Sequence, residues 1–525
     1  MAFKGRNIFL RVLIGSIYTT IAGLQSKTIS ISRDSVDITT EDEAPWRQLL
    51  SDTGMANLSI SANGIFKDDA AMNLMEDYAV NGTIGTFQIL FENGDSINGD
   101  FQVTSFEYST EVGNALVSSI SLESATVQTL LRSDATPELV SLQQAIICPQ
   151  ANGQCGSDVS IYGDTLAVGA LNMNGVGAVR IYTRTGTTWT FQQEITGSIP
   201  GGRFGNAVSL YEDTLAVGAY TWNVPAVNTN IGAVYIFTRA GGVWTEQQKL
   251  ANPVTYNQEQ LGWSVSLYKD TVIAGMPGRA ERGTGTGGAT IWKRTGTVWT
   301  VEASLLMTGS VYGSEHFGSG VAVYEDTVAV GCYGEVTTGG SRTGVVYVFT
   351  RTGSSWLLQA KIDADSSTKQ GGEQLGFSVD LYMDRIVAGA NYRDTANLSD
   401  GAVYTFTRVG SSWSQEQLLI PANPAVGAQD QIGTKVAIDD DTIIMSGRLV
   451  DVGAVADVGE AYRYVLQNGV WVEKQTLRDL SAGVAPVNTG GDNFGRGVDV
   501  YNNTAVVGAL GYDVTSNQGA AFVYR

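Results

Sequence analysis

The stretch that decides the fold is FGNAVSLYEDTLAVGA at residues 204–219, because FGSGVAVYEDTVAVGC at residues 317–332 repeats it almost identically. Each copy indicates a short strand after an aromatic-glycine pair, then a two-residue turn and a second, more apolar strand. A repeated sequence of this kind predicts stacked copies of one small unit. The turn and second strand occur seven times, as GDTLAVGA (163–170), EDTLAVGA (212–219), KDTVIAGM (269–276), EDTVAVGC (325–332), MDRIVAGA (383–390), DDTIIMSG (440–447) and NNTAVVGA (502–509).

Each repeat continues with two further strands. GAVYIFTR at residues 232–239 is followed by a tight turn and a tryptophan strand, VWTEQQKL at residues 243–250. Seven units of four short strands predict a seven-bladed β-propeller. We expect the VAVGA-type strand to lie nearest the axis because nearly all of its residues are apolar, GAVYIFTR to be the third strand, and the tryptophan strand to form the outer edge.

The last repeat ends at Arg525, directly after its third strand. A candidate for its outer strand lies before the first repeat, where ELVSLQQAIICPQ at residues 138–150 resembles the tryptophan strands. We therefore expect the stretch around Leu139–Ile147 to complete the seventh blade. Such closure leaves no unpaired strand edge between the first and last blades.

The repeat resembles the FG-GAP repeat of integrin-type propellers over about residues 138–525. Calcium-binding blades of that family carry a D-x-D-x-D-G loop, whereas the corresponding loops here include LNMNGV and PGRAERGTGTG. These loops lack the alternating oxygen ligands that calcium needs, so no metal site is expected. We expect the recurring turn aspartates to hydrogen-bond their own backbone; they are Asp164, Asp213, Asp270, Asp326, Asp384 and Asp441.

Residues 1–128 do not share the repeat. Their patterns predict a strand pair or bent strand at 18–33, an acidic loop at 36–54 with a short helical piece near Trp46–Leu50, a strand at 55–66, a helix within 68–79, and a hairpin at Asn93-Gly94 followed by further strands within 85–125. Ala71, Leu74, Met75 and Tyr78 would share one face of the helix.

The N-terminal sequence FKGRNIFLRVLIGSIYTTIAGLQS has the basic and apolar order of a signal peptide. Arg11 interrupts the apolar run, however, and the run alternates and is rich in β-branched residues. We therefore predict a strand pair here. No other stretch is long and apolar enough to span a bilayer.

The order of segments in residues 1–128 resembles the major tail tube protein of long-tailed bacteriophages and gene transfer agents. The resemblance rests on YTTIAGLQSKTISISRDSVDITTED, WRQLLSD, SISANGIFKDDAAM, FENGDSINGDFQVTSFEYS and VSSISLESA. It implies a β-sandwich or barrel with one flanking helix, which assembles as hexameric rings stacked into a tube. The tape-measure protein and passing DNA would occupy the lumen. IFLRVL and YTTIAGLQSKTISI would contribute to the inner barrel, and DSVDITTEDEAPWRQLL would reach the next ring.

The charge of the chain agrees with that expectation. The net charge is −20, and residues 1–130 contain 16 acidic and 7 basic residues. Tight nucleic-acid binding is excluded because it depends on basic side chains that neutralise phosphates. An acidic wall would instead let DNA slide past.

Enzymatic chemistry finds no support in the sequence. Cys148, Cys155 and Cys332 do not make a disulfide framework, and the single histidine, His316, is expected to be a loop residue. No nucleophile–base pair or cofactor loop occurs. We therefore expect no catalytic, cofactor-binding or metal-binding residues, and no cofactor.

The sequence thus predicts an all-β chain with a tail tube domain at 1–128, a linker at 129–137 and a seven-bladed propeller at 138–525. The expected function is that of a virion protein, made in the cytoplasm of a bacterial host, with no membrane insertion. A propeller is wider than a lumen left by six subunits, so it would project outward and aid weak adsorption to surface glycans through loops at 221–230, 333–344 and 391–401. The alternative is a surface or secreted adhesin that acts through the propeller, but it gives no reason for a tube-like N-terminal domain.

Overall fold

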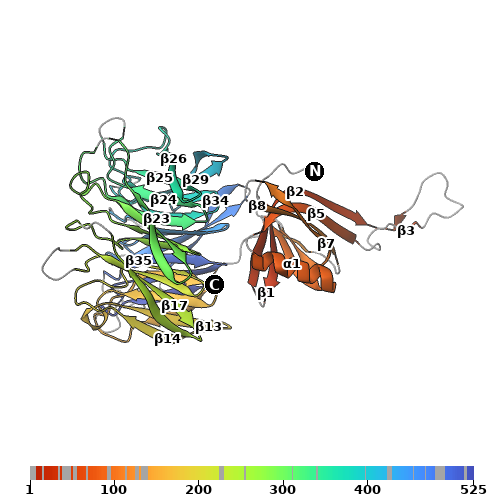
Figure 1. Ribbon diagram of the computed structural model, residues 1–525, viewed down its shortest axis with the longest axis horizontal. Coiled ribbons are helices and arrows are strands. Elements are labelled where there is room, and N and C mark those ends of the chain that lie inside the picture. Colours follow the sequence, from red (N-terminus) through yellow and green to blue (C-terminus); the bar gives the residue numbers. More distant parts are fainter. Residues whose placement is uncertain are drawn as a thin grey trace. The chain divides into compact units, whose positions relative to one another are not determined.

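The chain divides into two compact units, and the division falls between Glu138 and Leu139. The computed structural model describes residues 8–14, 17–33, 36–37, 49–50, 56–66, 69–90, 96–112, 115–124, 129–131 and 140–525, except for 224–229, 253–255, 310, 338–340, 396–397, 423–428, 453–454, 468, 479–490 and 513–516. Each unit is described by itself (Figure 1).

The first unit is an antiparallel β-barrel with one helix. Its strand order is β6-β1-β2-β5-β8-β7, and a further pairing between β6 and β7 closes the sheet. Helix α1 connects β5 to β6 and lies alongside the strands (Figure 1). The elements are β1 (Ile8–Ile14), β2 (Ile17–Arg33), β5 (Ala56–Phe66), α1 (Asp69–Asn81), β6 (Ile84–Leu90), β7 (Ser96–Val112), β8 (Ala115–Ser124) and the short β9 (Thr129–Leu131).

The core of the barrel follows from alternation along the strands. Successive side chains of a strand point to opposite faces, so every second residue enters the core. The predicted helix supplies Met75, which is fully buried, while Leu74 and Tyr78 are partly buried against the same cluster. The side chain of Ala71 lies outside the described residues. The strands supply Leu10, Val12, Ile60, Phe87, Ile89, Phe101, Val103, Ile120 and Leu122.

Two local predictions for this unit need correction. The helical piece expected near Trp46–Leu50 is wrong at its end, because Leu49–Leu50 forms strand β4 and pairs with β3 (Val36–Asp37). Pairing across the loop satisfies backbone groups that a single helical turn would leave open. Residues 46–48 and the predicted Asn93-Gly94 turn lie outside the described residues. The expected linker at 129–137 begins with strand β9, which pairs with the free edge of β7.

The second unit consists of seven four-stranded antiparallel sheets. The first strands of successive sheets contact one another, and the first strand of the first sheet contacts that of the last, so the sheets form a closed ring, a seven-bladed β-propeller (Figure 1). Blade 1 is β11 (Cys155–Tyr162), β12 (Thr165–Ala170), β13 (Ala178–Thr185) and β14 (Thr188–Thr196). Blade 2 is β15 (Val208–Tyr211), β16 (Thr214–Ala219), β17 (Ala233–Ala240) and β18 (Val243–Leu250). Blade 3 is β19 (Val265–Tyr268), β20 (Thr271–Gly275), β21 (Ala289–Thr295) and β22 (Val298–Leu305).

The remaining blades repeat this arrangement. Blade 4 is β23 (Phe317–Tyr324), β24 (Thr327–Cys332), β25 (Val345–Thr352) and β26 (Ser355–Ile362). Blade 5 is β27 (Leu375–Tyr382), β28 (Arg385–Ala390), β29 (Ala402–Val409) and β30 (Ser412–Leu419). Blade 6 is β31 (Ile432–Asp439), β32 (Thr442–Gly447), β33 (Glu460–Gln467) and β34 (Val470–Leu477). Blade 7 is β35 (Phe494–Tyr501), β36 (Thr504–Ala509), β37 (Ala520–Tyr524) and β10 (Leu142–Ile147), which pairs with β37.

The order of strands within a blade differs from the prediction in one respect. The strand nearest the axis is the one that begins with the aromatic-glycine pair, and the VAVGA-type strand is second. A second strand is covered on both faces by neighbouring blades, so all six residues of β16 are buried. The first strand instead lines a polar cavity, which explains why its sequence is less apolar. The third and outer strands are those predicted.

The two glycines of each repeat pack between blades. In the second strand of blade 2, a Cβ added at Gly218 would lie 2.1 Å from the carbonyl oxygen of Gly262 in blade 3. Gly262 has a φ of 84°, a conformation that glycine adopts without strain. Blade 6 carries Ser446 at the equivalent position, and its hydroxyl donates to the Gly495 carbonyl oxygen at 2.7 Å. The repeat motif is therefore a requirement for close contact between blades.

Candidate functional site

The outward face of the barrel is polar. Arg11 Nη1 donates to Gln88 Oε1 at 3.1 Å, and Thr86 Oγ1 donates to Asp100 Oδ1 at 2.6 Å. The hydroxyls of Ser61 and Ser121 lie 3.3 Å apart on the neighbouring strands. The described groups of this face are hydroxyls, an amide, a carboxylate and one guanidinium, which the Gln88 amide engages. A single basic side chain does not give tight binding of phosphates.

Strands β2 and β5 extend beyond the barrel as a two-stranded arm. Their pairing continues as far as Arg33 with Ala56, and β3 and β4 pair again further along the same connection (Figure 1). Of the predicted ring-to-ring loop, residues 34–50, the structure describes only the paired strands β3 and β4. Residues 38–48 of this loop lie outside the described residues.

The turn aspartates of the propeller have a different role from the one expected. In blade 2, Arg239 Nε donates to Asp213 Oδ1 at 2.6 Å, and Arg239 Nη1 donates to Thr165 Oγ1 of blade 1 at 2.8 Å. The guanidinium also lies over the Trp244 ring. The aspartate side chain thus orients an arginine that joins two blades, because a guanidinium offers several donors in one plane. The same ion pair occurs as Arg184–Asp164, Arg294–Asp270, Arg351–Asp326 and Arg408–Asp384.

Outer strands are joined by glutamines. Gln248 of β18 donates from Nε2 to the Trp299 carbonyl oxygen at 2.9 Å and accepts the Trp299 N–H at 2.8 Å. Gln144 of β10 makes the same pair of hydrogen bonds with Trp189 of blade 1, at 2.9 and 2.8 Å. Blades 7 and 1 are therefore joined by the same pair of glutamine hydrogen bonds as blades 2 and 3.

Further bonds join the first and last blades. Asp499 accepts the Ile161 N–H at 2.8 Å, and Arg184 Nη1 donates to Thr504 Oγ1 at 3.2 Å. A disulfide joins Cys148, just after β10, to Cys155 at the start of β11. A single disulfide is not a disulfide framework. This one links the outer strand of blade 7 covalently to the inner strand of blade 1. Cys332 is free and buried.

A ring of tyrosines surrounds one end of the propeller axis. Each ring centroid lies 4.7–5.2 Å from the next. Blade 6 has Asp439 at this position, and Asp439 accepts the Asn502 N–H from blade 7. Burial raises the pKa of the phenols of Tyr162, Tyr324 and Tyr501 well above its ordinary value, so these three stay protonated. In order, the ring is Tyr501, Tyr162, Tyr211, Tyr268, Tyr324 and Tyr382.

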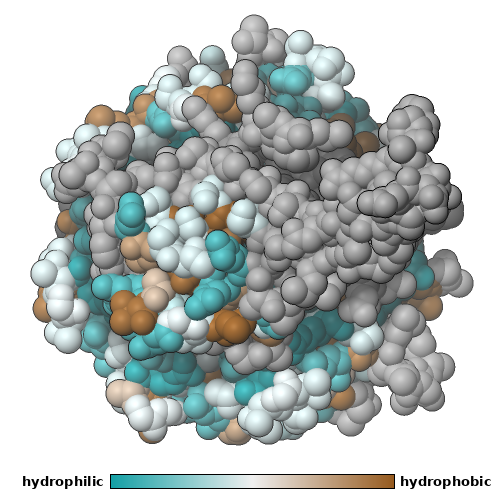
Figure 2. Space-filling view, turned by 90° about the vertical axis from the view of Figure 1, so that its right-hand side faces the viewer, coloured by the Kyte–Doolittle hydropathy of each residue, from teal (hydrophilic) through white to brown (hydrophobic). Residues whose placement is uncertain are grey.

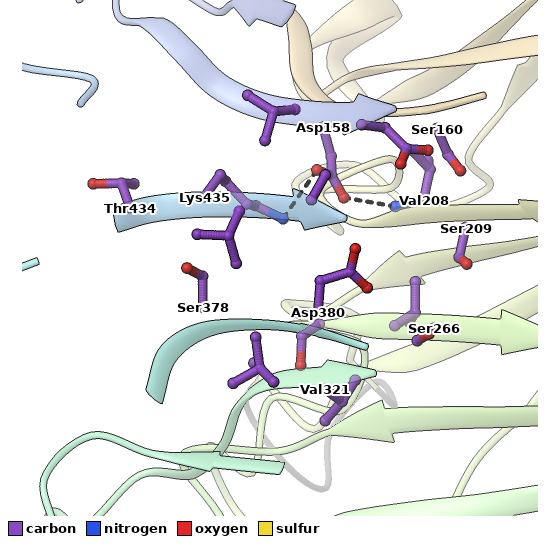
Figure 3. A pocket seen from close by; sticks show the side chains of 18 of the residues that line it. Asp158, Ser160, Val208, Ser209, Ser266, Val321, Ser378, Asp380, Thr434 and Lys435 are labelled. Carbon is purple, nitrogen blue, oxygen red and sulfur yellow. Dashed lines mark hydrogen bonds and ion pairs between the residues drawn. The ribbon is translucent and has the colours of Figure 1, made fainter. Parts of the chain in front are cut away.

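A cavity of about 310 Å³ lies among the inner strands (Figure 3). Lys435 of blade 6 points toward Asp158 of blade 1, with Nζ 3.0 Å from Oδ1, and Asp158 also accepts the Val208 N–H. Gly497 of the intervening blade lies so close to Asp158 that a Cβ there would be 2.7 Å from the Asp158 Cα. Each inner strand contributes one valine to the cavity wall, namely Val159, Val208, Val265, Val321, Val379, Val436 and Val498.

Two more carboxyl groups line this cavity. Asp380 accepts the N–H groups of Ile438 and Leu381, and burial raises the pKa of its carboxyl to about 7. Burial likewise raises the pKa of Asp499 to about 8, and the charge of Asp380 adds to that increase. In blades 1 to 3 a serine occupies the same position, and Ser209 accepts the Leu267 N–H in the same way.

Aromatic and basic side chains gather where the inner strands begin. Trp263 and Phe377 line the cavity there, with Tyr220 edge-on to Trp263 and Tyr333 beside Phe377. Arg448 and Arg496 line the same part. Burial lowers the pKa of Arg496, and the neighbouring positive charge of Arg448 lowers it further, although a guanidinium remains charged. We call this set of six side chains the cavity mouth.

The loops predicted to contact surfaces are described only in part, since 224–229, 338–340 and 396–397 lie outside the described residues. Within the first loop, Trp222 lies under the Lys249 ammonium at 4.0 Å. His316 lies in the loop before β23, as predicted, and stacks on Tyr333. The described residues on the face in Figure 2 are mostly hydrophilic, with scattered hydrophobic ones, which is the usual composition of a solvated surface.

The described part of the chain offers neither a cluster of metal ligands nor a helix that could cross a membrane. Among these residues, no three His, Cys, Asp or Glu side chains are grouped so that they could hold a metal ion. No described helix has the length and apolar character needed to cross a bilayer.

Comparison with known families explains the barrel and its arm. The model of the phage tail tube protein family matches residues 2–129. This part of the chain is therefore similar to phage tail tube proteins. In the propeller, the FG-GAP repeat family matches residues 189–237, 299–349, 356–406 and 484–524. The chain is thus a tail tube domain fused to an FG-GAP propeller, as the sequence predicted.

Individual proteins add detail to this comparison. No curated protein matches the chain. Two solved structures are similar to part of it, titled as the virion of a native gene transfer agent particle and as the tail of an empty gene transfer agent particle with C6 symmetry. Each is 27% identical, covers 25% of this chain and 98% of the solved chain, and has a TM-score of 0.22.

Proposed function

We propose that this chain is a structural subunit of a virion tail, in which six tail tube domains close a ring and successive rings stack into a tube that conducts DNA. The match of residues 2–129 to the tail tube family carries this proposal. The polar outward face of the barrel and the acidic balance of residues 1–130 support it, because a wall of this composition does not retain DNA. The role is structural rather than catalytic.

The paired arm of β2 and β5 is a candidate for the contact between stacked rings. A heterologous interface that repeats around an axis closes a ring, and contacts along the axis then extend it. The pairing of β2 and β5 continues to Arg33 and Ala56, and β3 and β4 pair within the connection between these strands. We propose that this connecting segment contacts the next ring. The lumen of the stacked rings would hold the tape-measure protein and later let DNA pass.

The propeller has a separate proposed role. Outside the tube, six copies in every ring would make even weak contacts effective, because each bound copy raises the local concentration of the others. We propose that the propeller aids adsorption to surface glycans and is not needed to build the tube.

Deleting residues 138–525 tests both roles. We expect the truncated subunit to form tubes of normal width, while particles that carry it adsorb less to cells or polysaccharide. Tubes that fail to form would show that the propeller is structural. Unchanged adsorption would remove the proposed role of the propeller.

A further inference from the structure

The cavity mouth contains two arginines without the carboxylate partner that Arg239 and its equivalents have. Among the described residues, other propeller arginines also form no ion pair, among them Arg203, Arg282, Arg342 and Arg463. Arg239 and its equivalents pair with a turn aspartate, and Arg393 pairs with the buried Glu373 at 2.6 Å. Within the described part of the chain, neither Arg448 nor Arg496 forms an ion pair, and the guanidinium of Arg496 forms no hydrogen bond. Arg448 donates only to the neutral Gln431 amide at 3.0 Å.

Unpaired guanidiniums are unexpected in a chain of net charge −20. Partly buried charges normally find a partner, because desolvation without one is costly. Burial and the charge of Arg448 lower the pKa of Arg496, and the nearby carboxylate of Asp158 offsets only part of that decrease. Two guanidiniums that line one cavity therefore form a place where a further negative charge would be stabilised. Guanidinium groups bind carboxylates through paired, parallel hydrogen bonds.

Aromatic rings stand beside these guanidiniums. Trp263 and Phe377 are partly buried and line the cavity, and Tyr220 and Tyr333 pack against them. Ser319 and Thr434 also line the cavity, and their hydroxyls donate to the carbonyl oxygens of Gly376 and Gln431. A volume of about 310 Å³ is at the small end of the range of about 300–1,000 Å³ for small-molecule sites. This suits one sugar ring rather than a long chain.

We propose that the cavity mouth binds a carboxylate-bearing sugar residue of an acidic polysaccharide, with the carboxylate on Arg448 and Arg496 and the sugar ring against Trp263 or Phe377. This proposal rests on the proposed adsorption role of the propeller and specifies the class of ligand that the propeller binds. The Asp158–Lys435 pair and the valine ring lie deeper in the cavity. The occupant therefore contacts only the outer part of the cavity.

The propeller itself offers substitutions that its fold tolerates. Other inner strands carry serine at the position of Arg496, as in Ser157 and Ser319, and blade 5 carries Asn391 at the position of Arg448. The double variant R448N/R496S therefore replaces both guanidiniums with residues that the repeat already uses. R496K keeps the positive charge but cannot form the two parallel hydrogen bonds that a guanidinium makes to a carboxylate. K269G removes a charge at the opposite end of the inner strands, and blade 1 has Gly163 at that position.

Binding is measured on the full chain by saturation-transfer NMR with trigalacturonic acid, its methyl ester and maltotriose. We expect the acid to bind with a millimolar Kd to the wild type and to K269G, at least tenfold more weakly to R448N/R496S, and with intermediate affinity to R496K. The ester and maltotriose should bind the wild type no better than the acid binds the double variant. Melting temperatures of all variants should agree, which excludes unfolding as the cause.

Equal binding of the acid by wild type and double variant would overturn the proposal, as would equal binding of acid and ester. Binding of a tri-glutamate peptide in preference to the acid would replace the sugar with a peptide ligand. Particle adsorption is assayed separately with R448N/R496S and with the deletion of residues 138–525. If the deletion abolishes adsorption while the acid does not bind, the site is wrong but the proposed function stands.

Discussion

Replacing Gln144 with alanine tests whether β10 joins the propeller ring. Gln144 forms two hydrogen bonds to the backbone of Trp189, and these connect the outer strands of blades 7 and 1. Q144A removes both bonds and leaves the β10–β37 ladder in place. Gln248 makes the same two bonds to Trp299 inside the ring, so Q248A is a matched control.

The magnitude follows from the two bonds. Each contributes about 0.5–1.5 kcal/mol net, so their loss costs about 2 kcal/mol in the free energy of unfolding. Unfolding entropy is about 2.1 cal/mol/K per residue, or roughly 0.8 kcal/mol/K for a unit of about 390 residues. Q144A should therefore lower the melting temperature by about 2–3 °C.

Tryptophan fluorescence during heating is a suitable assay, because only Trp46 of the 10 tryptophans lies outside the propeller. Q144A and Q248A should lower Tm by similar amounts if the contact between blades 7 and 1 resembles an internal one. A clear loss in Q248A with no loss in Q144A would refute closure of the ring by β10.

Three further predictions concern the propeller. The Cys148–Cys155 bridge spans seven residues, so C148S should lower stability by about 2.5 kcal/mol, and a reductant should lower the Tm of the wild type but leave that of the variant unchanged. The raised pKa values of Asp380 and Asp499, about 7 and about 8, mean that the folded state binds more protons than the unfolded state, so stability should fall as pH rises from about 4 to about 8. D380S/D499S keeps an oxygen acceptor and should flatten the dependence of Tm on pH between about pH 4 and pH 8; an unchanged slope would contradict this assignment. Met383 has a φ of 51° in a tight turn, so M383G should raise stability by about 0.5–1 kcal/mol in urea unfolding, and a destabilised variant would contradict the strain argument.

Much of the fold was predictable because the same residues recur at the same strand and turn positions in each repeat. A pair of an apolar residue and glycine recurs seven times, with phenylalanine in three of the copies, and the tryptophan strand recurs six times. The glutamine pair of the outer strands recurs at Gln143-Gln144. The tyrosine before each turn also recurs in six blades and would have predicted the tyrosine ring. The sequence wrongly predicted the second strand to lie nearest the axis, because all of its residues are apolar. A strand that neighbouring blades cover on both faces is equally apolar, so this pattern does not distinguish the two positions.

The cavity mouth was not predictable in the same way. Arg448 follows a second strand in blade 6, whereas Arg496 lies on the first strand of blade 7, so the two are not equivalent in the repeat. Trp263 and Phe377 come from two other blades. Only ring closure brings these residues to one cavity. The buried acceptor role of Asp499 likewise depends on its contact with Ile161, which is 338 residues away.

Electron microscopy of the purified full-length chain tests the central proposal most directly. Six-fold rings and stacked tubes should form, with additional density on the outside that disappears when residues 138–525 are deleted. A chain that stays monomeric at all concentrations, with residues 1–128 folded, would contradict the proposal that this protein builds a tail tube.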